Sequence, residues 1–341
     1  MRTPLGLRSD SSAAALRAGI SRLGEHPYMI DRLGNPMVAA VDGALPAGTA
    51  DPERFVALAQ SALQEACEPL QSVTQAALRL PLFLGLPEMR PGFSQYQAES
   101  VRQGLQRSGE PTVELDDIRL FAEGHAAGAV ALEAALGELA RGAQELCLVG
   151  GIESYFHPDT MEWLDANRQL AGEDGRSAFV PAEGAGFLLL ATERACKRLG
   201  LARQARVRAS VVRAESKLIK TPEVCLGEGL TEAVEQAVAQ AGAGGDKRIN
   251  DILCDINGER YRGQEWGFVC LRLSHYFDDP ADYSSPADAW GDMGAASIPL
   301  FAMLACQAAA RGYAKGPLTL LWASSEGGQR GAVVVETGQA G

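Results

Sequence analysis

Hydrophobic positions along the chain follow two periodicities that alternate. Apolar residues recur every three or four positions over 51–70, 93–109 and 227–242, which predicts amphipathic helices. Asp51 can cap the first of these, and Pro52 suits its first turn. Short apolar runs predict strands at 35–45, 78–88, 111–121, 145–149 and 205–216. Later segments predict a strand and a helix at 183–200, a strand with a polar loop at 249–259, a helix at 265–277 and two strands around a glycine-rich loop at 316–337.

Two further segments predict helices with almost no polar face. They cover about 125–141 and 291–312, and their central parts (126–136 and 295–306) are apolar on all sides. A helix that is hydrophobic all round is buried. With the alternation of strands and helices, this predicts an α/β protein in which helices lie between two sheets. We expect two halves, 1–200 and 201–341, joined at the short stretch 200–204.

Composition and charge restrict the classes of partner. The net charge is −12, and a nucleic-acid partner would require a basic face. The same charge weakly disfavours acyl-CoA and acyl carrier proteins, which are also anionic. The seven cysteines form no CxxC or Cys/His cluster, so we expect no metal, no cofactor and reduced thiols in the cytoplasm. No apolar run suits a signal peptide or a membrane span.

Five stretches in order resemble the thiolase-like superfamily, and specifically the β-ketoacyl synthases. The resemblance covers most of the chain and implies a duplicated fold of two α/β halves in five layers, αβαβα. The stretches are TPLGLRSDSSAAALRAGIS (3–21), GHAAGAVALEAALGELARGAQELCLVGGIES (124–154), GRSAFVPAEGAGFLLL (175–190), GDMGAASIPLFAMLA (291–305) and SSEGGQRGAVVVE (324–336).

The resemblance also implies where catalytic residues would lie. In the family a cysteine at the start of the first buried helix attacks an acyl thioester, and two further residues, His-His or His-Asn, support decarboxylation and condensation. Here the cysteine position is His125. The first histidine position, in the loop after DILCDI, falls on Asn257, and the second falls on Asp292. All three residue types are therefore changed.

Other departures concern assembly. The family's first strand, which precedes TPLG, is missing, so either the start is trimmed or that sheet edge is open. The stretch between Gly151 and Gly175 is also shorter than usual. The resemblance implies that strand 111–121 pairs with its copy in a second subunit. Asp116 and Asp117 would then lie near the twofold axis, where like charges disfavour a homodimer and leave room for a heterodimer.

Individual residues allow more than one interpretation. His125 can serve as a general base, which we expect to be neutral at a helix N-terminus, or fill space beside Asp292. Nothing in the spacing of Ser297, Ser324 or Ser325 completes a triad. Cys147 and Cys254 are packing residues in core strands. NGERYRGQEWG (257–267) predicts a polar stretch near the pocket mouth, where Glu259, Arg260, Tyr261, Arg262 and Glu265 bind a ligand, or form a salt-bridged loop or partner surface. Gly327 and Gly328 allow a tight turn beside the pocket.

The sequence thus predicts a catalytically degenerate ketosynthase-like protein that acts as a binding or assembly partner. Resemblance offers two precedents. Chain-length-factor subunits lack the cysteine and pair with an active ketosynthase, and thiolase-like accessory proteins are encoded with bacterial secretion effectors. The alternative is an atypical acyl-thioester transferase, decarboxylase or hydrolase that uses His125 and Asp292.

Overall fold

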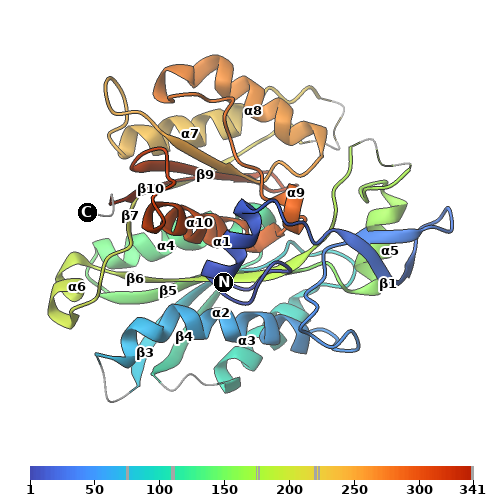
Figure 1. The fold of residues 1–341 in the computed structure, drawn as a ribbon, viewed down its shortest axis with the longest axis horizontal. Coiled ribbons are helices and arrows are strands. Elements are labelled where there is room, and N and C mark those ends of the chain that lie inside the picture. Colours follow the sequence, from blue (N-terminus) through green and yellow to red (C-terminus); the bar gives the residue numbers. More distant parts are fainter. Residues whose placement is uncertain are drawn as a thin grey trace.

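Five layers of helices and sheets make up the protein, as the sequence predicted (Figure 1). The structure is a computed structural model and describes all residues except 74–76, 109–111, 174, 176, 219, 220, 222 and 339–341. Outer helices cover one face of each sheet, and two helices fill the space between the sheets. The predicted end of a helix at Gly109 and the start of a strand at Pro111 fall outside the described residues.

The first sheet has the order β4-β3-β5-β6, in which the first three strands are parallel and β6 is antiparallel to β5. α2 (Glu53–Gln71) and α3 (Gln95–Ser108) pack on its outer face. Every residue of β5 is buried, because helices cover both faces of the sheet. The strands are β3 (Leu78–Gly85), β4 (Val113–Phe121), β5 (Leu146–Ser154) and β6 (Glu183–Ala191), and α6 (Glu193–Leu199) follows the last of them.

The second sheet repeats part of this plan in the order β7-β10-β9-β8. β8 and β9 are parallel, β10 is antiparallel to β9, and β7 lies antiparallel along the far side of β10. α7 (Glu228–Gln240) and α8 (Arg260–Leu273) cover its outer side. The triplet β3-β5-β6 of the first sheet thus corresponds to β8-β9-β10 of the second. The strands are β7 (Ala205–Ala214), β8 (Asp251–Cys254), β9 (Leu318–Ser324) and β10 (Gln329–Thr337).

The middle layer consists of α4 (Ala127–Ala140) and α10 (Ser297–Ala310), the two helices predicted to be apolar on all sides. Their side chains join both sheets in one hydrophobic cluster. The helices approach closely at Gly128, where a Cβ atom would lie 2.6 Å from Cδ of Pro299. Each helix is preceded by a 3₁₀ turn, η1 (Gly124–Ala126) and η3 (Gly294–Ala296), and the two turns contact each other.

Several short elements escaped the sequence prediction because their apolar pattern is weak. They are α1 (Ser9–Arg17), β1 (Gly24–Ile30), α5 (Pro158–Ala166), the 3₁₀ turn η2 (Ser274–Tyr276) and α9 (Ala287–Trp290). The strand predicted at 35–45 is limited to β2 (Pro36–Ala39), which pairs with β1 in a separate hairpin. The helix predicted at 265–277 begins five residues earlier, at Arg260, and ends at Leu273.

The stretch 200–204 connects α6 of the first half to β7 of the second. The division into 1–200 and 201–341 stays a prediction, because α4 of the first half and α10 of the second half pack against each other between the two sheets. Among the described residues, no helix combines the length and the hydropathy needed to cross a membrane.

Candidate functional site

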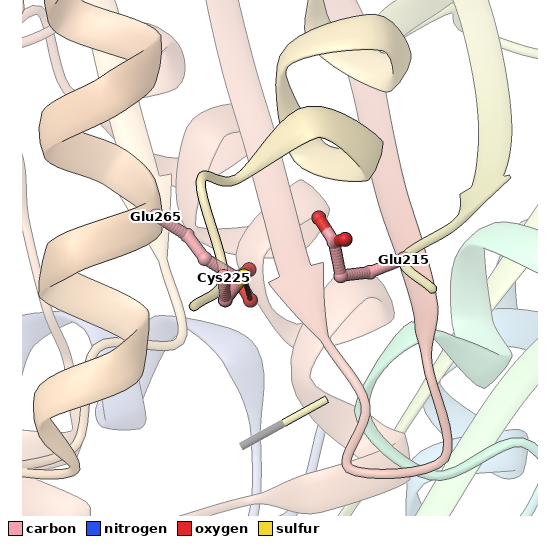
Figure 2. Close-up of side chains that lie close together, drawn as sticks. All are labelled: Glu215, Cys225 and Glu265. Carbon is pink, nitrogen blue, oxygen red and sulfur yellow. Dashed lines mark hydrogen bonds between the residues drawn. The ribbon is translucent and has the colours of Figure 1, made fainter. Parts of the chain in front are cut away.

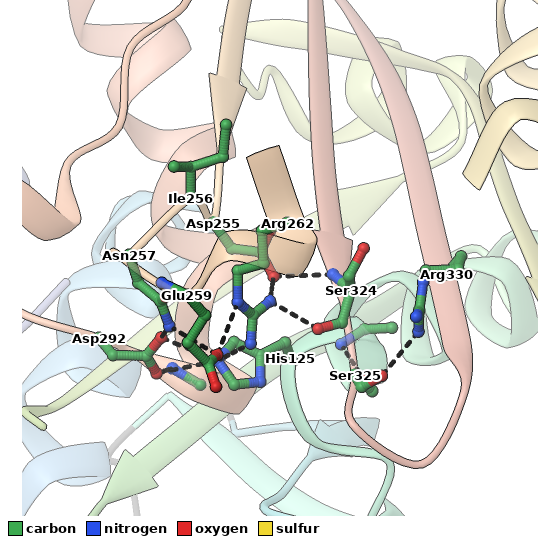
Figure 3. Close-up of polar contacts among 12 residues, drawn as sticks. His125, Asp255, Ile256, Asn257, Glu259, Arg262, Asp292, Ser324, Ser325 and Arg330 are labelled. Carbon is green, nitrogen blue, oxygen red and sulfur yellow. Dashed lines mark hydrogen bonds and ion pairs between the residues drawn. The ribbon is translucent and has the colours of Figure 1, made fainter. Parts of the chain in front are cut away.

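Two helix starts meet at the centre of the molecule and bring the three predicted site residues together. Nε2 of His125 lies 2.9 Å from each carboxylate oxygen of Asp292. Nδ2 of Asn257 donates to Oδ2 of Asp292 at 2.6 Å, from the loop after β8. Figure 3 shows these side chains around the Asp292 carboxylate. The sequence prediction that the three positions converge is therefore consistent with the geometry, although their roles stay a prediction.

Local backbone conformation explains why Asp292 sits where it does. Its Oδ1 accepts a hydrogen bond from the amide of Gly294, two residues ahead, at 2.9 Å, which holds the side chain against the start of η3. Gly294 has a φ of +41°, and a Cβ there would lie 1.9 Å from Oε2 of Glu153. Only glycine permits both the turn and this close approach. The hydroxyl of Tyr155 donates a further hydrogen bond to Oδ1 of Asp292 at 2.8 Å.

A fully buried guanidinium lies on the other side of His125. Nη2 of Arg262 is 3.1 Å from Nε2 of His125, and Nε of Arg262 donates to Glu259 at 3.1 Å. Nη1 of Arg262 donates to the carbonyl of Ser324 at 2.6 Å and also contacts Asp255. Two buried carboxylates therefore balance this cation. The pKa of Arg262 is raised well above its ordinary value because these anions outweigh the cost of burial.

The sequence placed Glu259, Arg260, Tyr261 and Arg262 in a polar loop that binds a ligand or is salt-bridged. The salt bridges are present, but Tyr261 and Arg262 lie in the first turn of α8 and are buried, so the loop placement was wrong for them. Glu259 occupies the N-cap position of α8 and is also buried. Arg260 is exposed, and its amide donates to Ser177. The prediction failed because charged residues near the start of a helix look solvated in sequence, whereas here ion pairs within the fold compensate their burial.

The ionisation of His125 also differs from expectation. Burial and the charge of Arg262 lower its pKa, but the contact with Asp292 raises it more, so the net pKa lies above the ordinary value. The helix dipole was expected to keep the imidazole neutral; the ion pair outweighs it. Since one nitrogen cannot donate to Asp292 and accept from Arg262, we assign Nε2–H as the donor to the closer carboxylate. Burial would raise the pKa of Asp292, but His125 and Arg262 hold it well below its ordinary value.

The sequence analysis missed an ion pair between Glu153 and Arg90, which lies next to the turn that follows Asp292. Glu153, the penultimate residue of β5, is 1% exposed and binds Nη2 of Arg90 at 2.5 Å. Its Oε2 accepts from the amide of Ala295 at 3.2 Å. The guanidinium of Arg90 lies 4.2 Å from the ring centroid of Tyr155. A sequence signal was present, because a carboxylate at the end of an all-apolar strand must find a buried partner.

The β9–β10 turn closes the site beside η1. The amide of Gly327 donates to Glu88 at 2.9 Å, and Gly328 has a φ of +112° in the tight turn that was predicted. In the same turn, Oγ of Ser325 accepts the amide of Ala126 at 2.8 Å and donates to the carbonyl of Glu123. The amide of Ala126, in the turn η1, therefore already donates its hydrogen bond to the Ser325 hydroxyl.

A second cluster of ionisable groups lies near the end of β7 (Figure 2). Ligand atoms of Glu215, Cys225 and Glu265 lie within 4.8 Å of one another. Both carboxylate oxygens of Glu265 bind Arg330 at 2.7 Å, and those of Glu215 accept backbone amides. Burial raises the pKa of Cys225 to about 11. These groups are engaged in structural contacts, and Glu265, predicted to bind a ligand or partner, is a buried ion-pair residue.

The two predicted packing cysteines lie in core strands, Cys147 in β5 and Cys254 in β8. Burial raises the pKa of Cys147 to about 12, and that of Cys254 higher still. Both are therefore neutral thiols at physiological pH, and a neutral thiol is a weak nucleophile.

The ion pair at the site predicts a specific pH dependence of stability. Asp292 has a lowered pKa and His125 a raised one, so the pair contributes fully between the ordinary values of 3.8 and 6.5. The contribution disappears as pH falls through the lowered pKa of Asp292 or rises through the raised pKa of His125. The difference in free energy of unfolding between wild type and His125→Gln should therefore shrink as pH increases from 6 to 9.

Urea unfolding of both proteins across this range checks the prediction. His275→Gln, at an exposed histidine, is the matched control and should track the wild type at every pH. A wild type–His125→Gln difference that stays constant from pH 5 to 9 would contradict the assignment of a charged His125.

Comparison with known proteins gives the fold a family context. Residues 124–195 match the family model of the β-ketoacyl synthase N-terminal domain. A search of curated protein sequences gave no significant match. Similar solved structures include the ishigamide ketosynthase/chain length factor, with a TM-score of 0.79 and 15% identity over 98% of this chain and 96% of that one.

Two further structures resemble the chain. A structure of AntDE with AntF, a type II polyketide synthase acyl carrier protein in complex with its ketosynthase, gives a TM-score of 0.75 and 14% identity over 98% of this chain and 97% of that one. The ketosynthase from module 6 of the bacillaene synthase of Bacillus subtilis 168 gives 0.73 and 13% over 99% of this chain and 70% of that one. The chain therefore has the thiolase-like fold of the ketosynthases, and its residues 124–195 form a β-ketoacyl synthase-like segment.

Proposed function

We propose that this ketosynthase-like protein is catalytically degenerate and acts as a non-catalytic binding or assembly partner. The observation that carries the proposal is the residue at the start of α4. His125 stands where the resemblance implies a nucleophilic cysteine, and its Nε2 is held by Asp292. Acyl transfer of the ketosynthase kind requires a thiolate that becomes acylated. An imidazole committed to a buried carboxylate does not supply that step.

The surrounding hydrogen bonds favour a structural role for the site. A thioester carbonyl that develops negative charge needs free N–H donors. The amide of Ala126 is instead bound to Ser325, and Asn257 donates to Asp292 and Glu259. These two donors are thus already paired within the protein, as expected where a former reaction site has become part of the core.

The solved relatives support a partner role without defining the partner. The ishigamide structure is a ketosynthase/chain length factor, and the AntDE structure includes an acyl carrier protein. We therefore retain two forms of the proposal, a subunit that pairs with an active ketosynthase and an accessory protein for a secreted effector. Both place the protein in the cytoplasm as a homodimer or heterodimer. Binding of acyl-CoA or an acyl carrier protein is less favoured, because the net charge is −12.

Native mass spectrometry of the protein purified from its own host tests the proposal. A stoichiometric second polypeptide is the expected result, and its sequence distinguishes the two forms: a ketosynthase in one case and a secreted effector in the other. A homodimer that carries a covalent acyl-sized mass would overturn the non-catalytic role.

One observation favours a second candidate, an acyl-thioester hydrolase or decarboxylase. Nε2 of His125 is hydrogen-bonded to Asp292, whereas no hydrogen bond joins Nδ1 of His125 to a described residue. In the neutral imidazole Nδ1 is a free lone pair that can activate water, with Asp292 orienting the ring. The raised pKa of His125 opposes this role below alkaline pH.

Thioester turnover separates the two functions. Under the enzyme reading, the purified protein hydrolyses an acyl-CoA thioester, and turnover disappears in His125→Ala but persists in the surface control His275→Ala. Under the partner reading, which we expect to hold, neither wild type nor variant exceeds the uncatalysed rate. Thermal unfolding of His125→Ala shows whether the fold survives the substitution.

A further inference from the structure

A buried histidine lies in the β1–β2 hairpin, outside the candidate site. The hairpin is a separate two-stranded sheet at the side of the molecule, next to α5, where the amide of Arg32 donates to Asp165 at 2.9 Å (Figure 1). Of the residues of β1, all of which the structure describes, His26 alone is buried, with 6% of its surface exposed. The ring centroids of His26 and Phe156 are 4.5 Å apart. His26 is thus a contact between the hairpin and the body of the protein.

The pairing of the two hairpin strands is interrupted beside His26. Ladder partners exist on either side, at Glu25 and Ile30, but the four residues between them lie opposite Met37 of β2 alone. A bulge of this kind leaves backbone amides without a partner in the ladder. These amides therefore need an acceptor from outside the ladder.

The imidazole of His26 supplies that acceptor. Its Nδ1 accepts hydrogen bonds from the amides of Tyr28 at 3.2 Å and Met29 at 3.0 Å. A ring nitrogen that accepts carries a lone pair, so the proton of the neutral imidazole is on Nε2. Nε2 is buried and has no hydrogen-bond partner among the described residues. The bulge thus requires the neutral ring in this one tautomer.

The charges around the ring also favour its neutral form. The guanidinium of Arg54 lies 4.2 Å from the ring centroid of Phe156, the same ring that contacts His26. Both oxygens of Glu183 bind Arg54 at 2.6 Å, and no carboxylate among the described residues is hydrogen-bonded to His26. Burial and the charge of Arg54 lower the pKa of His26 below its ordinary value of 6.5.

Protonation of His26 would disrupt this arrangement in two ways. The added proton occupies Nδ1, which then cannot accept from Tyr28 and Met29 and instead directs an N–H at their N–H groups. The resulting cation is also buried near Arg54 without a counter-charge of its own. Opening of the hairpin removes both penalties, because water then solvates the imidazolium and the freed amides.

The hairpin covers apolar residues that hold one wall of the candidate site. Met29 and Met37 pack in the small apolar cluster that contains Tyr155 and Phe179, whose ring centroids are 5.4 Å apart. The hydroxyl of Tyr155 donates to Asp292. Opening of the hairpin therefore uncovers the cluster that fixes the position of Tyr155.

We propose that the β1–β2 hairpin is a pH-sensitive cover of this cluster, closed by neutral His26 and released when the imidazole takes up a proton. Because the closed form binds this proton more weakly, closure is constant above pH 6.5 and weakens below it by up to about tenfold per pH unit, until the lowered pKa of His26 is passed. The amide of Ala40, directly after β2, donates to the carbonyl of Pro181 at 2.9 Å, so the base of the hairpin has an anchor that His26 does not control. The proposal does not depend on the proposed function.

Two other titratable groups lie near Arg54 and Phe156, and each has its own control. Burial raises the pKa of Asp51, ahead of α2, to about 6. A carboxyl with a raised pKa stabilises the closed form at low pH, which is opposite in sign to the effect of His26, so Asp51→Asn should still open in acid. His157 accepts the amide of Asp159 at 3.2 Å and is partly exposed, so His157→Asn, which keeps an acceptor there, should open as well.

Hydrogen exchange at single amides, measured by NMR between pH 5 and 8, tests the proposal. The rates at Tyr28 and Met29 are divided by those of an unstructured peptide with the sequence of residues 21–40, which gives a protection factor at each pH. In the wild type this protection should fall by up to about tenfold between pH 7.5 and 5.5. The amide of Val149 in β5 should stay protected, which distinguishes opening of the hairpin from unfolding of the whole protein.

His26→Asn provides the protein-side control, because the asparagine Oδ1 can accept the same amides but does not titrate. Its protection should be independent of pH, whereas His275→Asn, at an exposed histidine, should behave like the wild type. Protection in the wild type that does not change with pH, or an equal loss in His26→Asn, would overturn the proposal. The ¹⁵N shifts of His26 in the wild type give a second measurement that needs no variant: a proton on Nδ1 at pH 7.5 would overturn it as well.

Discussion

Replacing Arg262 by methionine should destabilise the protein by about 3–5 kcal/mol, the cost of removing one partner from a buried ion pair. The side chain is fully buried and balances Asp255 and Glu259. Methionine fills much of the volume but leaves two carboxylates without a counter-charge in a region that excludes water. Urea unfolding followed by circular dichroism measures the loss.

The matched control is Arg119→Met. Arg119 also contacts two carboxylates, Asp117 and Glu138, but its side chain is 42% exposed. Its loss should cost less than about 1 kcal/mol, because solvent screens exposed pairs. In addition, Arg262→Met/Asp255→Asn should recover part of the stability lost in Arg262→Met, since one of the orphaned charges is removed. If Arg262→Met and Arg119→Met are equally stable, the buried ion pairs of Arg262 contribute no more to stability than the exposed pairs of Arg119.

The second large effect is expected at Gly151, in the middle of β5. A Cβ atom there would lie 2.2 Å from the carbonyl oxygen of Ala295 and 3.0 Å from Cα of Ala296. Both are backbone atoms of the turn η3, so no side-chain rotation relieves the clash. Gly151→Ala should therefore lower the free energy of unfolding by about 3 kcal/mol or more, the upper part of the range for overpacking.

Gly43→Ala is the control, since no heavy atom lies within 4 Å of the added Cβ. It should be neutral or slightly stabilising, because alanine restricts the unfolded chain. Differential scanning calorimetry compares the two variants. The displacement of η3 should also weaken the contact between His125 and Asp292, so the pH dependence of stability should flatten in Gly151→Ala. A Gly151→Ala protein as stable as Gly43→Ala would mean that the first sheet packs less closely against η3.

The layered architecture could be predicted because it rests on local patterns. α4 and α10 carry apolar residues on every side, and such helices have no stable place except between two sheets. The strands of both four-stranded sheets were predicted from their short apolar runs. The strand β1 of the separate hairpin was not predicted, and it is largely exposed. The helix α5 was not predicted because its few apolar residues show no clear helical periodicity. His157 and Pro158 nevertheless form a recognisable helix start.

The sequence predicted which residues lie at the candidate site, but not how their side chains interact. Resemblance indicated His125, Asn257 and Asp292, and the structure brings their side chains together. The burial of the network around them was not predicted, since Arg262 and Glu265 were expected in a polar stretch at the pocket mouth. Charged side chains cannot be recognised as buried from sequence unless their partners are known, and Arg330, the partner of Glu265, lies 65 residues away.

The sequence by itself determined the strands of the two large sheets, the buried middle helices and the absence of a cysteine at the start of α4, because each follows from residue identity and short-range periodicity. Only the tertiary structure decided how the polar groups pair. His125 meets Asp292 across 167 residues and Arg262 across 137. His125 and Asp292 meet because the starts of α4 and α10 pack against each other. The charges of Asp292 and Arg262 then determine the pKa of His125.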